Sequence, residues 1–146
     1  MVVGYEYFGR PYVIGEAPGR RPGLPLAGAR RRIARLLEIE PEELSDMFHW
    51  QNLLSEWPGY GPNGGSEFPM EAARAAANKI TQRPLILLGR RVAQAFDVDQ
   101  PWFVWRDGLA VCPHPSGLSR WWNDPEHTQQ ATEFWRTQVL TGSWRD

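Results

Sequence analysis

Short apolar runs alternate along the chain with segments whose apolar residues recur at helical spacing. The clearest strand candidates are Tyr12–Ile14, which breaks into a loop at Gly15, and Leu85–Leu88, which Gly89 closes. A further strand is predicted over Met47–Trp50 and ends at Asn52. Alternating strands and helices are typical of a parallel, or mostly parallel, sheet covered by helices on both faces, so we expect the α/β fold class.

Helices are expected between these strands. Apolar spacing predicts a helix over Ala29–Leu37, and Pro41 followed by two glutamates starts a second, short one. After a turn-rich segment, Ser66 is the expected N-cap of a helix through Ala72 to Lys79, in a helical region that Pro84 ends. A short helix containing Val92, Ala93 and Phe96 follows the strand at Leu85–Leu88.

The last third of the chain contains a hairpin signal and a capped helix. Phe103–Trp105 and Leu109–Val111 flank Arg106-Asp107-Gly108, and the Asp-Gly pair predicts a tight turn between two strands. The second arm runs into Pro113-His114-Pro115. Asp124 is the expected N-cap of the C-terminal helix, with Pro125 in its first turn.

Ligands of parallel α/β sheets bind at the carboxyl ends of the strands. Applied here, this rule selects Gly15–Gly19 after the first strand, Asn52 after the second and His114–Arg120 after the last. We expect these segments, which are far apart in the sequence, to converge on one crevice.

Length and composition favour one ordinary globular domain spanning residues 1–146. A chain of 146 residues has room for a single core, and 42% hydrophobic residues are enough to form it. The longest aliphatic run, Leu85–Leu88, is too short to span a bilayer. Cys112 is the single cysteine, and Met1–Gly9 lacks the layout of a secretory signal. We therefore expect an intracellular monomer, in the cytoplasm or nucleoid, without membrane contact, metal or cofactor.

The charge balance limits how the chain can contact a polyanion. Sixteen basic and seventeen acidic residues give a formal charge of −1, which argues against tight, nonspecific binding driven by net charge. Any nucleic-acid contact has to be local. Arg30–Arg32 with Arg35 are consistent with a DNA path, although such a run is more often a solvated helix face.

Two short loops carry the candidate chemistry. Gly15-Glu16-Ala17-Pro18-Gly19 is a turn that contains a carboxylate, and His114-Pro115-Ser116-Gly117-Leu118-Ser119-Arg120 combines an imidazole, two hydroxyls, an apolar residue and a guanidinium. Each loop alone is a weak signal. Their occurrence at the predicted mouth of the same sheet is what raises both above ordinary surface loops.

Together these loops resemble the two active-site motifs of the uracil-DNA glycosylase superfamily. Val13–Gly19 is similar to the first motif of its thermophilic iron–sulfur branch, and His114–Arg120 is similar to the superfamily's second motif. Asn52 matches the position of the base-reading asparagine. The resemblance implies a three-layer α/β/α fold with a central four-stranded sheet. It also implies a DNA base-excision enzyme that hydrolyses the N-glycosidic bond of a flipped-out base.

The resemblance assigns roles that agree with the chemistry of the reaction. His114 would donate a hydrogen bond to O2 of the departing uracil, assisted by backbone N–H groups from Gly15 to Ala17. Glu16 would hold the attacking water and stabilise the sugar cation. The amide of Asn52 offers both a donor and an acceptor, which match O4 and N3–H of uracil.

The remaining residues of the second motif would contact the DNA. Leu118 would fill the gap left by the flipped base, the alternative being ordinary loop packing. Ser116, Ser119 and Arg120 are candidate phosphate contacts. Trp121 and Trp122 would either stack on bases or, as is commoner, pack within the protein.

Three departures from the iron–sulfur branch leave the substrate open. The four cluster cysteines are absent, and Leu26 stands where that branch has the phenylalanine that stacks on uracil. Gly19 stands where the most uracil-selective branch excludes the thymine methyl with a tyrosine, so a 5-substituted uracil is also a possible substrate. Two alternatives remain: an enzyme acting on another base or a free nucleotide, and a catalytically inactive nucleic-acid-binding module.

Overall fold

The computed structural model describes residues 6–16, 27–55, 68–115 and 120–139 of the chain. Its centre is a four-stranded sheet in which every strand pair is parallel. The strand order is β2-β1-β3-β4, formed by β1 (Glu6–Gly15), β2 (His49–Asn52), β3 (Gln82–Leu88) and β4 (Leu109–Cys112). The fold is therefore three-layer α/β/α, as the sequence predicted, and the sheet is entirely rather than mostly parallel.

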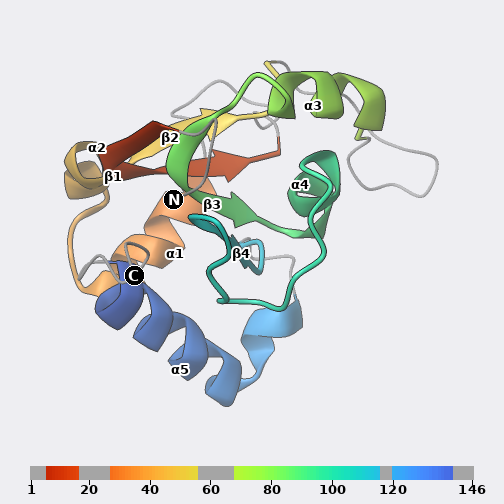
Figure 1. Ribbon diagram of the computed structural model, residues 1–146. Helices are drawn as coiled ribbons and strands as arrows, with labels where there is room; N and C mark the ends of the chain where they lie inside the picture. Colours follow the sequence, from red (N-terminus) through yellow and green to blue (C-terminus); the bar gives the residue numbers. More distant parts are fainter. Residues whose placement is uncertain (1–5, 17–26, 56–67, 116–119, 140–146) are drawn as a thin grey trace.

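Helices cover both faces of the sheet (Figure 1). One face packs against α1 (Ala27–Leu37) and α5 (Pro125–Glu133), which continues as the π-helical η3 (Phe134–Val139). The other face packs against α3 (Met70–Ala77) and α4 (Arg90–Ala95). The short elements η1 (Pro41–Glu43) and α2 (Leu44–Met47) lead into β2, and η2 (Arg120–Asn123) leads into α5.

Alternation along β3 explains why the sheet has a core on each face. Ile86 and Leu88 belong to the core under α1 and η3, whereas Leu85 and Leu87 belong to the core under α3 and α4. All of these side chains are fully buried, because successive residues of a strand point to opposite faces and both faces are covered. This accounts for the continuous aliphatic run in the sequence.

The structure corrects the prediction that Pro84 ends a helical region. The helix α3 ends earlier, at Ala77, and Pro84 lies inside β3. Its lack of an N–H is tolerated where the ladder between β3 and β1 is irregular, at the register shift between Tyr7 and Tyr12. The expected N-cap is also wrong: α3 begins at Met70 with Pro69 at the cap position, and Ser66 lies outside the described residues.

The predicted hairpin is half right. Arg106 and Leu109 exchange both backbone hydrogen bonds, at 2.9 Å each, and Asp107 and Gly108 have φ of 53° and 74°. Positive φ at both central positions is the geometry of a type I′ turn. Residues 103–105, however, form no strand: Phe103 has φ of 64°, and although its N–H donates to the Val111 carbonyl at 2.9 Å, no regular ladder follows. The second arm pairs in parallel with β3 as β4 instead.

The predicted cap of the C-terminal helix is confirmed. The Asp124 carboxylate accepts a hydrogen bond from the Glu126 N–H at 2.9 Å, and Pro125 occupies the first turn of α5. Among the described residues, no helix has the length and apolar character needed to cross a membrane.

Candidate functional site

The carboxyl ends of all four strands lie along one edge of the sheet. Gly15 at the end of β1 is in register with Asn52 at the end of β2, and Leu88 is in register with Cys112. Glu16 therefore emerges at the same edge as the segment that contains His114. Glu16, Asn52 and His114, one residue from each of the three predicted segments, thus share this edge of the sheet.

Glu16 and His114 both lie beside Gly89, the residue that follows β3. A Cβ atom placed on Gly89 would lie 3.4 Å from His114 Cβ, 3.7 Å from its Cδ2 and 3.8 Å from Glu16 Oε2. The carboxylate oxygen and the imidazole carbon thus both lie within 4 Å of one point. Gly89 also has φ of 99°, which L side chains rarely adopt. A side chain at this position would therefore contact both His114 and Glu16.

The main chain around Glu16 is fixed by the strand beside it. The Leu53 N–H donates to the Gly15 carbonyl and the Leu54 N–H donates to the Glu16 carbonyl, both at 2.9 Å. The side chain is 25% exposed, and its Oε1 lies 3.6 Å from Nη1 of Arg91, the second residue of α4. The carboxylate is thus partly buried and paired with a cation.

His114 is half-buried between two buried prolines, Pro113 and Pro115. Its carbonyl oxygen accepts a hydrogen bond of 2.9 Å from Nε1 of the buried Trp122. Burial lowers the pKa of the His114 imidazole, and the Glu16 carboxylate partly opposes this shift. A neutral ring at physiological pH follows, which carries one N–H donor and one acceptor nitrogen.

Asn52 lies at the same edge, on the outer strand of the sheet. Its Oδ1 is fully buried and has no hydrogen-bond partner among the described residues. A buried acceptor without a partner costs about 1–3 kcal/mol. A ligand that presents an N–H to this oxygen would recover that energy.

Part of the predicted site lies outside the described residues. This applies to Ala17, Gly19 and Leu26 of the first loop, and to Ser116, Leu118 and Ser119 of the second. Arg120 is described: it is exposed and begins η2.

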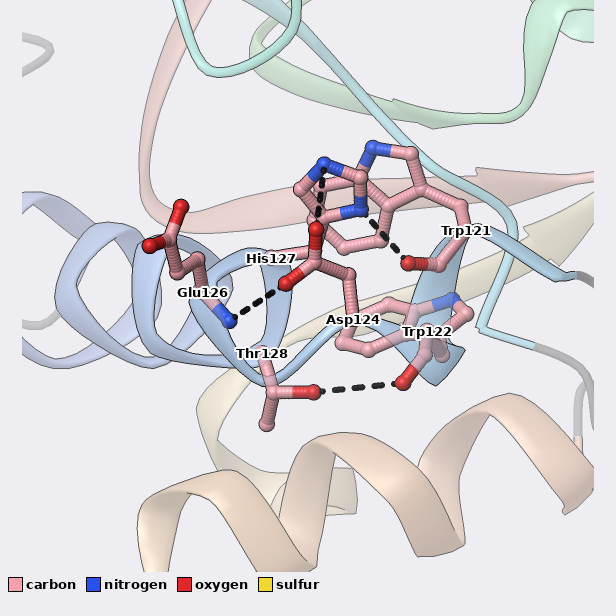
Figure 2. Close-up of polar contacts among 6 residues, drawn as sticks. All are labelled: Trp121, Trp122, Asp124, Glu126, His127 and Thr128. Atoms are coloured by element: carbon pink, nitrogen blue, oxygen red, sulfur yellow. Dashed lines mark hydrogen bonds and ion pairs between the residues drawn. The ribbon is translucent and has the colours of Figure 1, made fainter.

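The first turn of α5 contacts the residues that follow the His114 loop (Figure 2). The His127 ring stacks on the Trp121 ring with centroids 4.5 Å apart, and its Nδ1 lies 2.7 Å from the Trp121 carbonyl oxygen. Asp124 lies 3.8 Å from the other ring nitrogen of His127. Trp122 is buried and Trp121 is partly buried, so both pack within the protein, the commoner of the two expected fates.

The arginine run of α1 is only partly a solvated face. Arg31 and Arg35 are exposed, but Arg30 is buried and lies 4.8 Å above the Trp50 ring. Arg32 lies 4.7 Å above the Trp122 ring. These two guanidiniums cover aromatic rings by cation–π contact.

A hollow lies at the opposite edge of the sheet, where β3 and β4 begin, and residues that line it form hydrogen bonds within the protein. Arg83 donates to the Asp107 carbonyl at 3.3 Å, and Gln100 Nε2 donates to the Val104 and Leu109 carbonyls at 2.7 and 2.9 Å. These polar groups fix the turn before β4. We assign no ligand to this hollow.

The described residues contain no group of three or more His, Cys, Asp or Glu side chains placed to hold a metal ion. Cys112 is buried at the end of β4, and burial raises the pKa of its thiol. It packs as a small apolar residue.

Sequence reasoning missed two residues of this site, Gly89 and Arg91. Gly89 was interpreted only as the end of a strand. A glycine between a buried strand and a helix, at the edge where α/β sheets bind ligands, is the signal that marks it. Arg91 has no such signal, because only the packing of α4 beside the end of β1 makes it a partner of Glu16.

No protein-family model matches the chain, and no curated protein matches its sequence. The family resemblance therefore rests on the motifs alone.

Proposed function

We propose that this chain is a monofunctional DNA glycosylase of base-excision repair. Its substrate is a flipped-out uracil, or a 5-substituted uracil, and hydrolysis of the N-glycosidic bond leaves an abasic site in the DNA. The observation that carries the proposal is that the Glu16 carboxylate and the His114 ring both approach Gly89, each with an atom within 4 Å of the position of a Cβ there. This hydrolysis needs two groups, a carboxylate and a neutral imidazole, and here both lie at the carboxyl ends of the strands.

The reaction separates charge between the sugar and the base. The electron pair of the C1′–N1 bond leaves with the base, and negative charge develops at O2 while the sugar gains oxocarbenium character. An N–H of neutral His114 stabilises the charge at O2 by hydrogen bonding. Glu16 stabilises the sugar cation and accepts a proton from the water whose oxygen forms the new bond to C1′.

Recognition of the base is assigned to Asn52. Its Oδ1 is a buried acceptor without a partner among the described residues, and N3–H of uracil is a donor that fits it. The amide nitrogen would donate to O4. Cytosine presents the reverse pattern at these positions, so the same side chain disfavours it.

The test uses single- and double-stranded oligonucleotides that carry one uracil, followed by alkali cleavage at abasic sites. We expect strand scission with the parent protein and a loss of roughly a hundredfold or more with His114→Ala or Glu16→Gln. His49→Gln is the matched control, since this histidine lies at the start of β2 and stacks on Tyr12 at 4.5 Å. It should cleave like the parent.

The absence of scission on both substrates, with His114→Ala indistinguishable from the parent, would reject the glycosylase. Release of a base from free nucleotides would then support the alternative of an enzyme that acts on free nucleotides. DNA binding without base release would support the inactive module.

A further inference from the structure

Arg91 and Glu16 form an ion pair that divides the two oxygens of the carboxylate. Arg91 Nη1 lies 3.6 Å from Oε1. The other oxygen, Oε2, lies 3.8 Å from the position of a Cβ on Gly89, and His114 Cδ2 lies 3.7 Å from the same position. One oxygen thus faces the cation, and the other lies near Gly89, as does the His114 ring.

The main chain at Glu16 is held by hydrogen bonds, so only the side chain of Glu16 still has to be oriented. The carbonyls of Gly15 and Glu16 are already bonded to Leu53 and Leu54, so the main chain is fixed while the side-chain torsions are not. Arg91 comes from a different element, α4, which follows Gly89 directly. Its guanidinium also lies 5.9 Å from the Phe68 ring, and its side chain is 48% exposed.

We propose that Arg91 is a positioning residue: it holds Oε1 of Glu16 and thereby keeps Oε2 near Gly89 and the His114 ring. The inference rests on the proposed glycosylase function for its kinetic consequence. Its electrostatic consequence holds without that function. The Glu16 carboxylate stabilises the charged form of His114, and the Arg91 cation next to that carboxylate offsets the effect.

Arg90 provides a matched control on the same turn of the same helix. Its Nη1 donates to the Gln100 carbonyl at 2.7 Å, and its guanidinium lies 3.7 Å above the Trp102 ring. Arg90→Gln removes the same charge as Arg91→Gln but leaves the Glu16 pair intact. Arg91→Lys keeps the charge and gives up the planar fork.

The first measurement is the pKa of His114 by NMR titration of its ring. The chain has three histidines, so the resonance is identified by its loss in His114→Gln. We expect the pKa to rise in Arg91→Gln, to fall in Glu16→Gln, and to change less in Arg90→Gln than in Arg91→Gln. Equal shifts in the two arginine variants would overturn the proposal, because they would reflect net charge alone.

The second measurement is a double-mutant cycle in the uracil-excision assay. We expect Arg91→Gln to lower kcat roughly tenfold in the parent background, Arg91→Lys to restore part of it, and Arg90→Gln to leave kcat unchanged. In the Glu16→Gln background the effect of Arg91→Gln should vanish. An undiminished effect there would show that Arg91 acts elsewhere and overturn the proposal. If the parent excises no uracil, the glycosylase assignment fails and the titration alone decides the role of Arg91.

Discussion

The Asn52 side chain carries a buried carbonyl oxygen that has no hydrogen-bond partner among the described residues. Its neighbour in the sheet, Gly15, immediately precedes Glu16. At the scale of single residues, this oxygen is therefore an acceptor that an N–H of a ligand would satisfy.

Asn52→Asp should weaken discrimination for uracil. The aspartate keeps an acceptor for N3–H but loses the amide donor to O4, which is worth about 1.4 kcal/mol, or tenfold. The ratio of uracil to cytosine excision, measured on matched oligonucleotides, should fall by roughly that factor. An unchanged ratio would remove Asn52 from base recognition.

The lowered pKa of His114 predicts how stability depends on pH. Below about 6.5, the unfolded chain protonates this histidine before the folded protein does, so the free energy of unfolding falls as the pH drops towards the folded value. The contribution of the neutral His114 ring to the free energy of unfolding is fully present above about pH 6.5. Urea denaturation over a pH series should show this slope, and His114→Gln should flatten it.

His49 adds to the same slope. Burial lowers its pKa, and the nearby Arg10 lowers it further. The slope in His114→Gln is therefore reduced and not abolished. Identical slopes in the parent and in His114→Gln would show that burial of this ring has no thermodynamic effect.

At the scale of elements, η2 contacts the candidate histidine through a hydrogen bond, and the start of α5 contacts η2. Trp122 in η2 donates to the His114 carbonyl, and its ring is covered by Arg32 from α1. The Asp124 cap and the Trp121–His127 stack fix the helix that follows (Figure 2). The position of His114 thus depends on elements that contribute no candidate catalytic group.

Trp122→Phe should lower the free energy of unfolding by about 1 kcal/mol through loss of this hydrogen bond. Trp105→Phe is the matched comparison: Trp105 packs against the same core, but its buried Nε1 has no partner among the described residues. Urea denaturation followed by circular dichroism should show a smaller loss for Trp105→Phe. Equal losses would mean that ring packing, and not the bond to His114, accounts for the change.

At the scale of the whole molecule, one sheet is shared by two cores. Ile86 and Leu87 are consecutive residues of β3, and each is fully buried in a different core. The strand itself pairs with β1 on one side and β4 on the other. Loss of either core should therefore be transmitted to the whole sheet.

Ile86→Ala and Leu87→Ala should each lower the free energy of unfolding by about 2–5 kcal/mol. Both should do so within one cooperative transition, seen at the same urea concentration by fluorescence and by circular dichroism. Gln94→Ala on the exposed side of α4 is the control, with a change of at most about 0.5 kcal/mol. Separate transitions for the two probes would contradict a single domain.

The local pattern of the sequence was sufficient to predict the layers of the fold. The run Leu85–Leu88 has to be buried on both faces, and Asp124 with Pro125 has to begin a helix, because these preferences depend on neighbours in the chain. The placement of Glu16 and His114 at one edge also followed, since parallel strands all end on the same side of their sheet. These inferences required no knowledge of particular contacts.

Only the tertiary structure decided which residues meet. Phe103–Trp105 has strand-like composition, yet the chain turns there and Leu109–Cys112 pairs with β3 instead. The approach of Glu16 and His114 to Gly89 and the pairing of Arg91 with Glu16 join segments from β1, α4 and the end of β4. Contacts of this kind depend on how helices pack against the sheet, and that packing is set by the whole core, which no local pattern of residues encodes.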